Sequence, residues 1–410
     1  MKRAPRRCLQ WLAVCLTVAL FARSLLTPGA AAGEQAQLCV YFPNWNVYSD
    51  GGAQVKNLPW GKIDCILHAF WKIVPDGDGF SIVSTDPWAD TDPDNPKAHF
   101  PQYAQCAGRY PGVDILLSIG GWNCCGFFSQ MAATAAGRAS FIGSCISVLR
   151  QYPFLTGLDI DWEYPGVARS GGGANEGNPV KGDDYQNYPL LLKELRAGLD
   201  AAFGKGKKQL TVCAAASVDI LAKQDYEALF PYVNRVHLMT YDMTGPGDAK
   251  TGHHSALYGA LSADTAVKYL RKQGVPTAKI AIGTPLYSHG WKLKNAGDQP
   301  LGAAARGLTS GGTKLWKELK KLESGAVAPG SPGWHAGYDE ASQAAYLWND
   351  DPASGSCRTF YTYENERSLD AKLQYIRIHS LGGLIVWQSG GDDAARGYPM
   401  LTRIHQALGN

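Results

Sequence analysis

Eight short apolar segments, most of them followed by a helical pattern, set the strongest limit on the fold of this 410-residue chain. Segments that are almost continuously apolar and alternate with helices predict a parallel sheet. Eight such units predict an α/β fold of the TIM (β/α)8 barrel type. The expected strands are 37–42, 63–70, 113–119, 157–163, 209–216, 233–241, 279–287 and 383–388.

The seventh and eighth expected strands are separated by far more chain than one helix needs. Residues 292–367 include their own helical segment and an alternating, strand-like segment, so we expect a small α+β insertion domain there. The catalytic barrel is then formed by residues 33–291 and 368–410. Functional residues of a TIM barrel gather where the strands end.

The N-terminus has the pattern of a secretory signal peptide over residues 1–32. Four basic residues between positions 2 and 7 precede an apolar run over 8–21, and small residues follow at 28–32. The run is too short to span a bilayer, and no later segment has the spanning length. The sequence therefore predicts a secreted, extracellular protein without a membrane segment.

Charge and cysteine content narrow the possible partners. Without residues 1–32 the net charge changes from +3 to −2, and no basic stretch interleaved with aromatic residues stands out, so nucleic acid is not an expected partner. Eight cysteines remain, an even number that favours some disulfides in an oxidising compartment. Their spacing shows no metal-binding pattern, including at the adjacent Cys124 and Cys125.

The segment "GLDIDWEYPG" places three carboxylates at alternate positions of the fourth expected strand: Asp159, Asp161 and Glu163. Alternate side chains of a strand share one face. A solvated edge strand would explain this pattern, but the bulky neighbours and the position at a strand end favour an enclosed face. Enclosed like charges about 6.6 Å apart resist simultaneous ionisation and keep their protons to higher pH. Such carboxyl groups are suited to general acid catalysis.

Aromatic and polar side chains gather at the other expected strand ends. Each alone is more often part of a core, but together they describe a cleft lined by rings and a few carboxylates. Such a cleft suits a carbohydrate, whose C–H faces stack on rings while its hydroxyls bind polar groups. The residues are Trp122, Met239, Tyr241, Asp242, Tyr287 and Trp387.

The shared face of Asp161 and Glu163 also limits the mechanism. Most glycosidases place two carboxyl groups on opposite sides of the scissile bond, whereas these two approach a sugar from the same side. Unless a carboxylate elsewhere attacks, the nucleophile must belong to the substrate. An acetamido group on C2 of the sugar could provide it.

These residues match a known family. "GLDIDWEYPG" closely resembles the DxxDxDxE signature of glycoside hydrolase family 18, the chitinases. "YFPNW", "HAF", "SIGGW", "MTYDM", "TGHHSALY" and "GGLIVWQ" follow in the family's order, so the resemblance covers residues 38–393. The expected insertion, with "GYDEAS" and "TFYTYENERSL", resembles the α+β domain that walls the cleft of deep-groove chitinases.

The resemblance implies a chitinase that cleaves β-1,4-linked N-acetylglucosamine polymers with retention, by substrate assistance. Glu163 would be the general acid and later the base. Asp161 would orient and stabilise the acetamido group, Asp159 would share a proton with Asp161, and Tyr241 would hydrogen-bond the acetamido group.

The resemblance further implies a monomer that binds chitin and chitooligosaccharides and needs no metal or cofactor. It also implies a disulfide between Cys39 and Cys65, as in animal-type members. Trp387 would form the floor under the distorted sugar, Trp122 would stack on a neighbouring sugar, and Asp242 would support the bound sugar. The full set of implied substrate-binding residues is Tyr41, Phe70, Trp122, Tyr164, Met239, Asp242, Tyr287 and Trp387.

Three departures from the family pattern stand out. Thr156 replaces the first Asp of the signature, and Gly247 replaces a common Trp. Ser288-His289 stands where Gly-Arg often follows the tyrosine, so we expect a sugar contact or an ion pair to be missing there. At Thr156 we expect tuning rather than loss of activity.

Three other functions compete with a chitinase. A chitin-binding lectin of this fold would typically lack the acid at the Glu163 position, which this chain has. An endoglycosidase of the chitobiose core of N-glycans fits the "MTYDM" strand end and the large insertion less well. A purely structural protein would not need an acidic face whose burial is costly.

Overall fold

The computed structural model describes residues 35–49, 54–173, 176–295, 297, 299–328 and 330–409. The expected signal peptide, residues 1–32, lies outside the described residues. The chain divides into the units Met1–Gln35 and Ala36–Asn410, and the fold below is that of the second unit. No helix among the described residues combines the length and the apolar character needed to cross a membrane.

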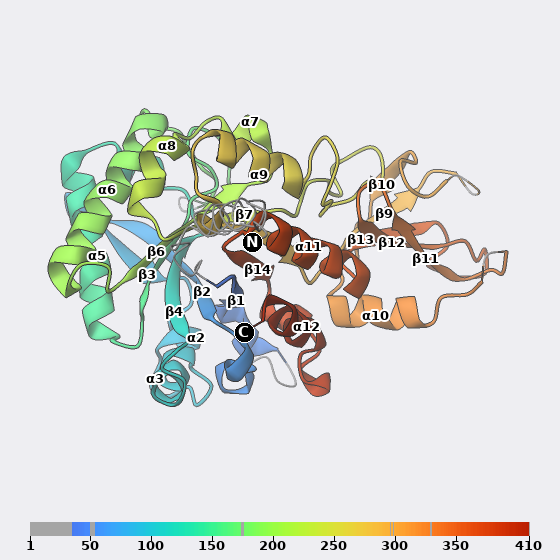
Figure 1. Ribbon diagram of the computed structural model, residues 1–410, viewed down its shortest axis with the longest axis horizontal. Coiled ribbons are helices and arrows are strands. Elements are labelled where there is room, and N and C mark those ends of the chain that lie inside the picture. The colour runs from blue at the N-terminus through green and yellow to red at the C-terminus, as the bar shows by residue number, and fades with distance from the viewer. Residues whose placement is uncertain are drawn as a thin grey trace, which may run out of the picture. The chain divides into compact units, whose positions relative to one another are not determined.

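Eight parallel strands form a closed barrel, which confirms the expected TIM barrel (Figure 1). Strand β1 pairs with both β14 and β2 and so closes the sheet. Every residue of β8 is buried, which explains why this segment is almost continuously apolar. Every residue of β5 and β7 is buried as well, including the polar Asp159, Asp161 and His237. The barrel strands are β1 (Gln37–Pro43), β2 (Cys65–Asp76), β4 (Asp114–Gly120), β5 (Gly157–Asp161), β6 (Gln209–Ala215), β7 (Arg235–Met239), β8 (Ile280–Pro285) and β14 (Gly383–Trp387).

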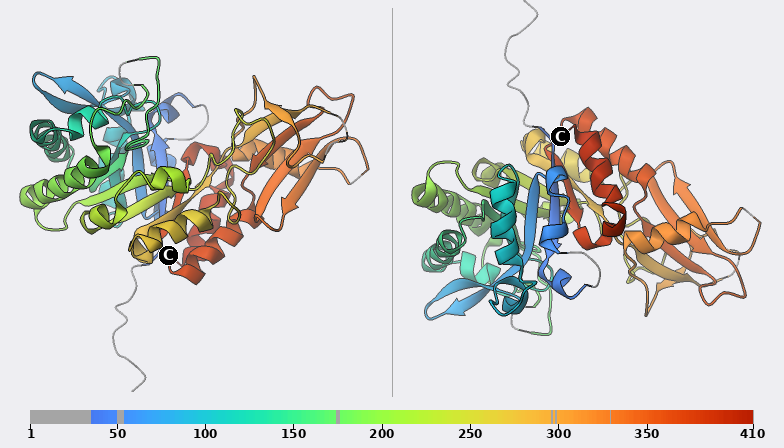
Figure 2. Two further views of the ribbon diagram at one scale, coloured as in Figure 1. Left: turned by 90° about the horizontal axis from the view of Figure 1, so that it is seen from above. Right: turned by 90° about the horizontal axis from the view of Figure 1, so that it is seen from below.

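Helices surround the strands (Figure 2), and the main apolar core lies between the two layers. Side-chain caps define several helix starts: Thr134, Asp183 and Ser262 each accept a hydrogen bond from a backbone N–H of the first turn. The helices of the barrel are α2 (Pro87–Asp90), α3 (His99–Arg109), α4 (Phe128–Ala132), α5 (Ala135–Gln151), α6 (Asp184–Phe203), α7 (Val218–Leu221), α8 (Tyr226–Leu229), α9 (Ala263–Lys272), α11 (Glu366–His379) and α12 (Pro399–Leu408).

A hairpin that the sequence did not predict extends the second barrel strand. Strand β2 continues to Asp76 and pairs in antiparallel fashion with β3 (Gly79–Ser84) across a short turn. Gly77 has φ +55° in this turn, which favours glycine. The backbone N–H groups of Phe80 and Ile82 donate to serine hydroxyls of α5, so the hairpin is held against that helix.

A second, antiparallel sheet lies in sequence between β8 and β14 (Figure 1). Its order is β10 (Ala305–Gly307), β9 (His289–Leu293), β13 (Thr359–Tyr363), β12 (Ala344–Asn349) and β11 (Trp334–Asp339), and α10 (Trp316–Ser324) belongs to the same region. Strand β9 begins three residues before the expected boundary at 292 and bonds directly to β13.

A buried ion pair connects this second sheet to the barrel. Glu364, next to the end of β13, pairs with Lys372 of α11. Thr284 of β8 donates a hydrogen bond of 2.7 Å to the same carboxylate, and Lys372 also contacts the Ser255 hydroxyl at 2.5 Å. The strand that leaves the insertion is therefore fixed to a barrel strand by a buried charge network.

The expected disulfide between Cys39 and Cys65 is wrong for this structure, because both thiols are free. The two residues are register partners on the parallel strands β1 and β2. The thiols share a hydrogen bond instead, which lowers the pKa of Cys39 and raises that of Cys65.

Candidate active site

The three carboxylates of "GLDIDWEYPG" lie along β5 and just beyond its C-terminal end. Asp159 and Asp161 are buried on the strand, and half-buried Glu163 comes two residues after it. Strand β5 lies between β4 and β6, so the alternative of a solvated edge strand is wrong. The intervening apolar side chains pack in the main core instead; they are Leu158, Ile160 and Trp162.

Asp159 is the most strongly hydrogen-bonded of the three acids. It accepts hydrogen bonds from the hydroxyls of Tyr41 (3.0 Å), Ser118 (2.8 Å) and Thr211 (2.6 Å), and His237 Nδ1 lies 3.3 Å from Oδ1. Burial alone would raise its pKa, but His237 and the hydroxyl donors outweigh burial and lower the pKa. The sequence predicted that this group of enclosed acids keeps its protons to higher pH, whereas the pKa of Asp159 itself is lowered.

Asp161 and Glu163 behave as the sequence predicted. Burial, with the charges of Glu163 and Asp159, raises the pKa of Asp161 well above its usual value. Its Oδ1 atom makes no hydrogen bond to the described residues. Burial also raises the pKa of Glu163 to about 7, and the charge of Asp242 acts in the same direction. Glu163 can thus carry a proton near neutral pH, as a general acid requires, and the pKa of Asp161 is shifted in the same direction.

Glu163 lies where two cavities of about 510 and 570 Å³ meet. The first cavity extends toward Trp45, Phe70 and Trp387, and the second toward Arg169 and His289. A polymer can therefore occupy the cleft on both sides of the acid. The residues that line both cavities are Trp122, Glu163, Tyr164, Met239, Tyr241 and Asp242.

Aromatic rings form one end of the first cavity. Phe70 and Trp387 stack with ring centroids 5.7 Å apart and planes 19° apart, and Trp45 lies 6.1 Å from Trp387. Trp45 is 44% exposed. Rings that are fixed by one another and open to solvent on one side provide the flat faces on which sugar C–H groups stack.

Trp122 lies at the rim shared by the two cavities and is 54% exposed. The Arg169 guanidinium lies 3.8 Å from the centroid of its ring and donates to its backbone carbonyl. Gly120 and Gly121, which precede the tryptophan, have φ +117° and +84°. A Cβ at Gly120 would overlap the Asp161 carbonyl, so glycine lets this loop approach the acidic strand.

Two of the implied substrate-binding residues line neither cavity. Tyr41 is buried beneath Trp387, with ring centroids 5.2 Å apart, and its hydroxyl bonds to Asp159 and to Cys213 (2.9 Å). Tyr287 is half-buried, and its hydroxyl donates to Asp242. Both tyrosines therefore contact the carboxylates of the site rather than the open cleft.

Asp242 follows β7 in a left-handed conformation (φ 58°) that directs its carboxylate into both cavities. His289 Nε2 lies 2.7 Å and His254 Nδ1 3.8 Å from Oδ1. Burial opposes ionisation, but the two histidines lower the pKa of Asp242 well below its usual value. His289 thus contacts Asp242 at the position where we expected a sugar contact or an ion pair to be missing.

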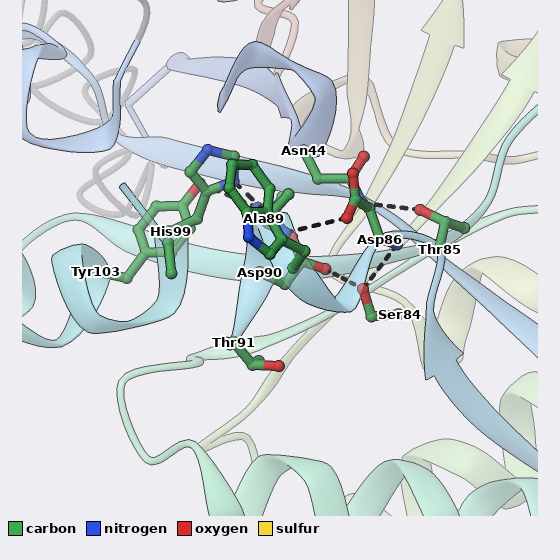
Figure 3. A network of polar contacts seen from close by, with 12 residues as sticks. Asn44, Ser84, Thr85, Asp86, Ala89, Asp90, Thr91, His99 and Tyr103 are labelled. Carbon is green, nitrogen blue, oxygen red and sulfur yellow. Dashed lines mark hydrogen bonds and ion pairs between the residues drawn. The ribbon is translucent and has the colours of Figure 1, made fainter. Parts of the chain in front are cut away.

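A buried network fixes the wall of the first cavity (Figure 3). Asp90 accepts hydrogen bonds from Ser84 Oγ (2.5 Å) and Trp71 Nε1 (3.0 Å) and lies 2.9 Å from His68 Nε2. Ser84 Oγ in turn accepts a hydrogen bond from the backbone N–H of Asp86, which lines the cavity. The hydrogen bonds of Asp90 and Ser84 therefore fix the segment between β3 and α2, whose residues form this wall of the cavity.

Thr156, the main departure in the signature, lies just before β5. Its hydroxyl accepts a hydrogen bond of 2.9 Å from the backbone N–H of Ile115 and lies 3.3 Å from the carbonyl of the same residue. The threonine thus ties the start of β5 to β4, at the opposite end of the strand from Glu163.

Sequence reasoning missed several residues of the site. Trp45, Arg169 and His289 line the cleft, while Cys213 and His237 lie beneath it. His237 could have been found, because it alternates with Met239 and Tyr241 and so shares their face. For Arg169, which comes from a glycine-rich loop, we find no comparable signal.

Comparisons with known proteins agree with this geometry. The family model described as "Glycosyl hydrolases family 18" matches residues 37–392. Chitinase A of Pseudoalteromonas piscicida is 28% identical over 89% of this chain and 51% of its own length. Chitinase A1 of Niallia circulans is 29% identical over 93% of this chain and 60% of its own length. The chain thus spans about half to three fifths of these curated relatives.

A solved structure of similar length shows the same fold. The family 18 N-acetylglucosaminidase from Paenibacillus barengoltzii is 28% identical, with a TM-score of 0.72 over 91% of this chain and 99% of that chain. The barrel, the acidic strand β5 and the cleft at its end together define a glycoside hydrolase. More particularly, the chain belongs to glycosyl hydrolases family 18.

Proposed function

We propose that this chain is a secreted chitinase that cleaves β-1,4-linked N-acetylglucosamine polymers with retention. One observation carries the proposal: Glu163, with a pKa raised to about 7, lies between two cavities that can hold a chain on either side of the cleaved bond. The carboxyl group beside it, Asp161, comes from the same strand face, so the two act on a sugar from one side.

In the proposed first step, Glu163 gives its proton to the glycosidic oxygen. The acetamido oxygen of the same substrate attacks the anomeric carbon, and the bond to the leaving sugar breaks. Asp161 orients the acetamido group by accepting a hydrogen bond from the N–H of that group. As positive charge develops on that group, the proton of Asp161 moves toward ionised Asp159, so that Asp161 becomes the counter-charge. Tyr241, which lines both cavities, donates its hydroxyl to the acetamido group.

In the second step, water attacks the anomeric carbon and gives a proton to the Glu163 carboxylate, and the bond between the anomeric carbon and the acetamido oxygen breaks. The configuration of the product is then the same as that of the substrate. We assign sugar contacts to the residues that line the cleft, with Trp387 as the floor and Trp122 at the rim. Tyr41 and Tyr287 act by positioning Asp159 and Asp242, to which their hydroxyls bind.

The alternative nucleophile is Asp242, an ionised carboxylate that also lines both cavities. Substrate chemistry separates the two mechanisms. Oligosaccharides with glucosamine in place of N-acetylglucosamine at the reacting position lack the acetamido oxygen and should not be cleaved, whereas a nucleophilic Asp242 would still cleave them. Nuclear magnetic resonance of early products should show the β-anomer; early α-anomer would contradict retention.

Export rests on the expected signal peptide. Protein recovered from the culture medium of an expressing cell should begin near residue 33, as read by mass spectrometry of its N-terminal peptide. Retention of residues 1–32 in the recovered protein would contradict this part of the proposal. We also propose that the chain acts as a monomer, which size-exclusion chromatography with light scattering would test.

A further inference from the structure

Three groups of histidine, cysteine and carboxylate side chains among the described residues bring possible metal-ligating atoms within 4.8 Å of one another. Two of the groups, one around Asp90 and one around Asp159, are buried. The third consists of Asp242, His254 and His289 and reaches the cleft. A metal site needs a path by which the ion can enter, and of the three groups only the third has one.

The geometry of this third group is close to that of a metal site. His289 Nε2 lies 2.7 Å and His254 Nδ1 3.8 Å from the same oxygen of Asp242. Donor atoms on a tetrahedral Zn²⁺ with bonds of about 2.0–2.1 Å lie about 3.3 Å apart. The observed separations bracket this value, so small side-chain rotations suffice. The Asp242 side chain is 56% exposed and leaves a coordination position open to the cleft.

His254 provides an independent sign of a missing partner. Its side chain is completely buried, yet neither ring nitrogen makes a hydrogen bond to the part of the chain that the structure describes, and Nδ1 lies 3.8 Å from the Asp242 carboxylate. Buried polar atoms without partners are costly and rare. Lys372, the nearby positive charge, is paired with Glu364. The histidine is therefore placed to donate a lone pair to a ligand beside Asp242.

We propose that Asp242, His254 and His289 bind a divalent transition-metal ion of the Zn²⁺ type, and that the bound ion blocks sugar binding. Two imidazoles and one carboxylate are ligands that suit zinc better than magnesium or calcium. Water from the cleft takes the open position. The Tyr287 hydroxyl donates to the same oxygen, Oδ1, that the two histidines approach, so an ion bound there takes the place of this hydrogen bond. The blocking effect rests on the proposed role of Asp242 in sugar binding, whereas metal binding itself does not.

Calorimetric titration of the chelator-treated full-length protein with ZnCl₂ tests the site. We expect one ion per chain, and an affinity at least about tenfold weaker in His289→Gln. Position 289 is half-buried, so it tolerates substitution, and the glutamine amide keeps an N–H donor for Asp242. His253→Gln is the matched control, because His253 pairs with Asp339 at 3.2 Å rather than with Asp242. No binding by the wild type below millimolar Zn²⁺, or unchanged affinity in His289→Gln, would overturn the proposal.

A second titration tests the link to the cleft. We expect N-acetylglucosamine hexasaccharide to bind Glu163→Gln at least about tenfold more weakly when Zn²⁺ is bound, because the ion occupies a sugar-binding carboxylate. Unchanged oligosaccharide affinity in the presence of bound zinc would place the ion outside the sugar path and overturn the blocking effect. Failure of the wild type to cleave any chitooligosaccharide would refute the proposed function but leave the metal titration unaffected.

Discussion

His237 lowers the pKa of the innermost acid of the site: Nδ1 lies 3.3 Å from Asp159 Oδ1, and both side chains are completely buried. Because Asp159 is ionised, its charge helps to keep a proton on Asp161, and the pKa of Asp161 is raised. The histidine thus influences the reacting groups without lining the cleft.

We predict that His237→Gln lowers kcat about tenfold or more, the effect of losing a hydrogen bond to a charged group, while KM changes little. Without the histidine the pKa of Asp159 rises. As the pH is lowered, the variant should therefore lose its activity at a higher pH than the wild type does. Rate profiles between pH 3 and 7 measure this shift. His99→Gln, at another completely buried histidine, is the control for a structural effect. An acidic limb identical to that of the wild type would contradict the prediction.

The raised pKa of Glu163 predicts the basic limb of the pH profile. A general acid must carry its proton, and this proton is lost as the pH rises through about 7. The kcat/KM for the hexasaccharide should therefore fall about tenfold per pH unit above pH 7. A basic limb near pH 4.5, the ordinary value for glutamate, would show that burial does not act on this group as described.

Trp387→Ala should weaken oligosaccharide binding by about tenfold, because the ring that stacks on Phe70 forms the aromatic floor. Calorimetry in the Glu163→Gln background separates binding from turnover. Tyr110→Ala, an exposed aromatic residue that lines neither cavity, is the matched control. Equal affinities of the two variants would remove Trp387 from the sugar site.

The free thiols of Cys39 and Cys65 predict a simple chemical result. Protein unfolded without reductant in the presence of an alkylating reagent should carry the label on both cysteines, because neither takes part in a disulfide. Peptide mass spectrometry reads the label. A peptide pair joined through these two cysteines would contradict the structure.

The barrel could be predicted because its strands are buried on both faces and therefore form short apolar runs bounded by polar residues. β7, for example, is buried throughout and was expected within two residues of its observed ends. The hairpin of β2 and β3 was missed because Lys72 and Pro75 interrupt the apolar run where the strand leaves the barrel.

The acidic face was visible in the sequence because its alternation is local. The partners that give the acids different pKa values come from other strands: Thr211 from β6 and His237 from β7. Which residues meet Asp159 depends on the register between strands, and one sequence does not reveal that register. For this reason we expected the acidic face as a whole to keep its protons to higher pH, whereas the pKa of Asp159 is lowered. The pairing of His289 with Asp242 was missed for the same reason, because 47 residues separate them.

The central claim is that Glu163 is the proton donor. The most direct measurement compares turnover and binding of N-acetylglucosamine hexasaccharide by the wild type and Glu163→Gln, with Glu227→Gln, at an exposed glutamate of α8, as the matched control. The account predicts that Glu163→Gln loses about 10²-fold or more in turnover but binds the oligosaccharide as the wild type does. A near wild-type rate in Glu163→Gln would contradict it.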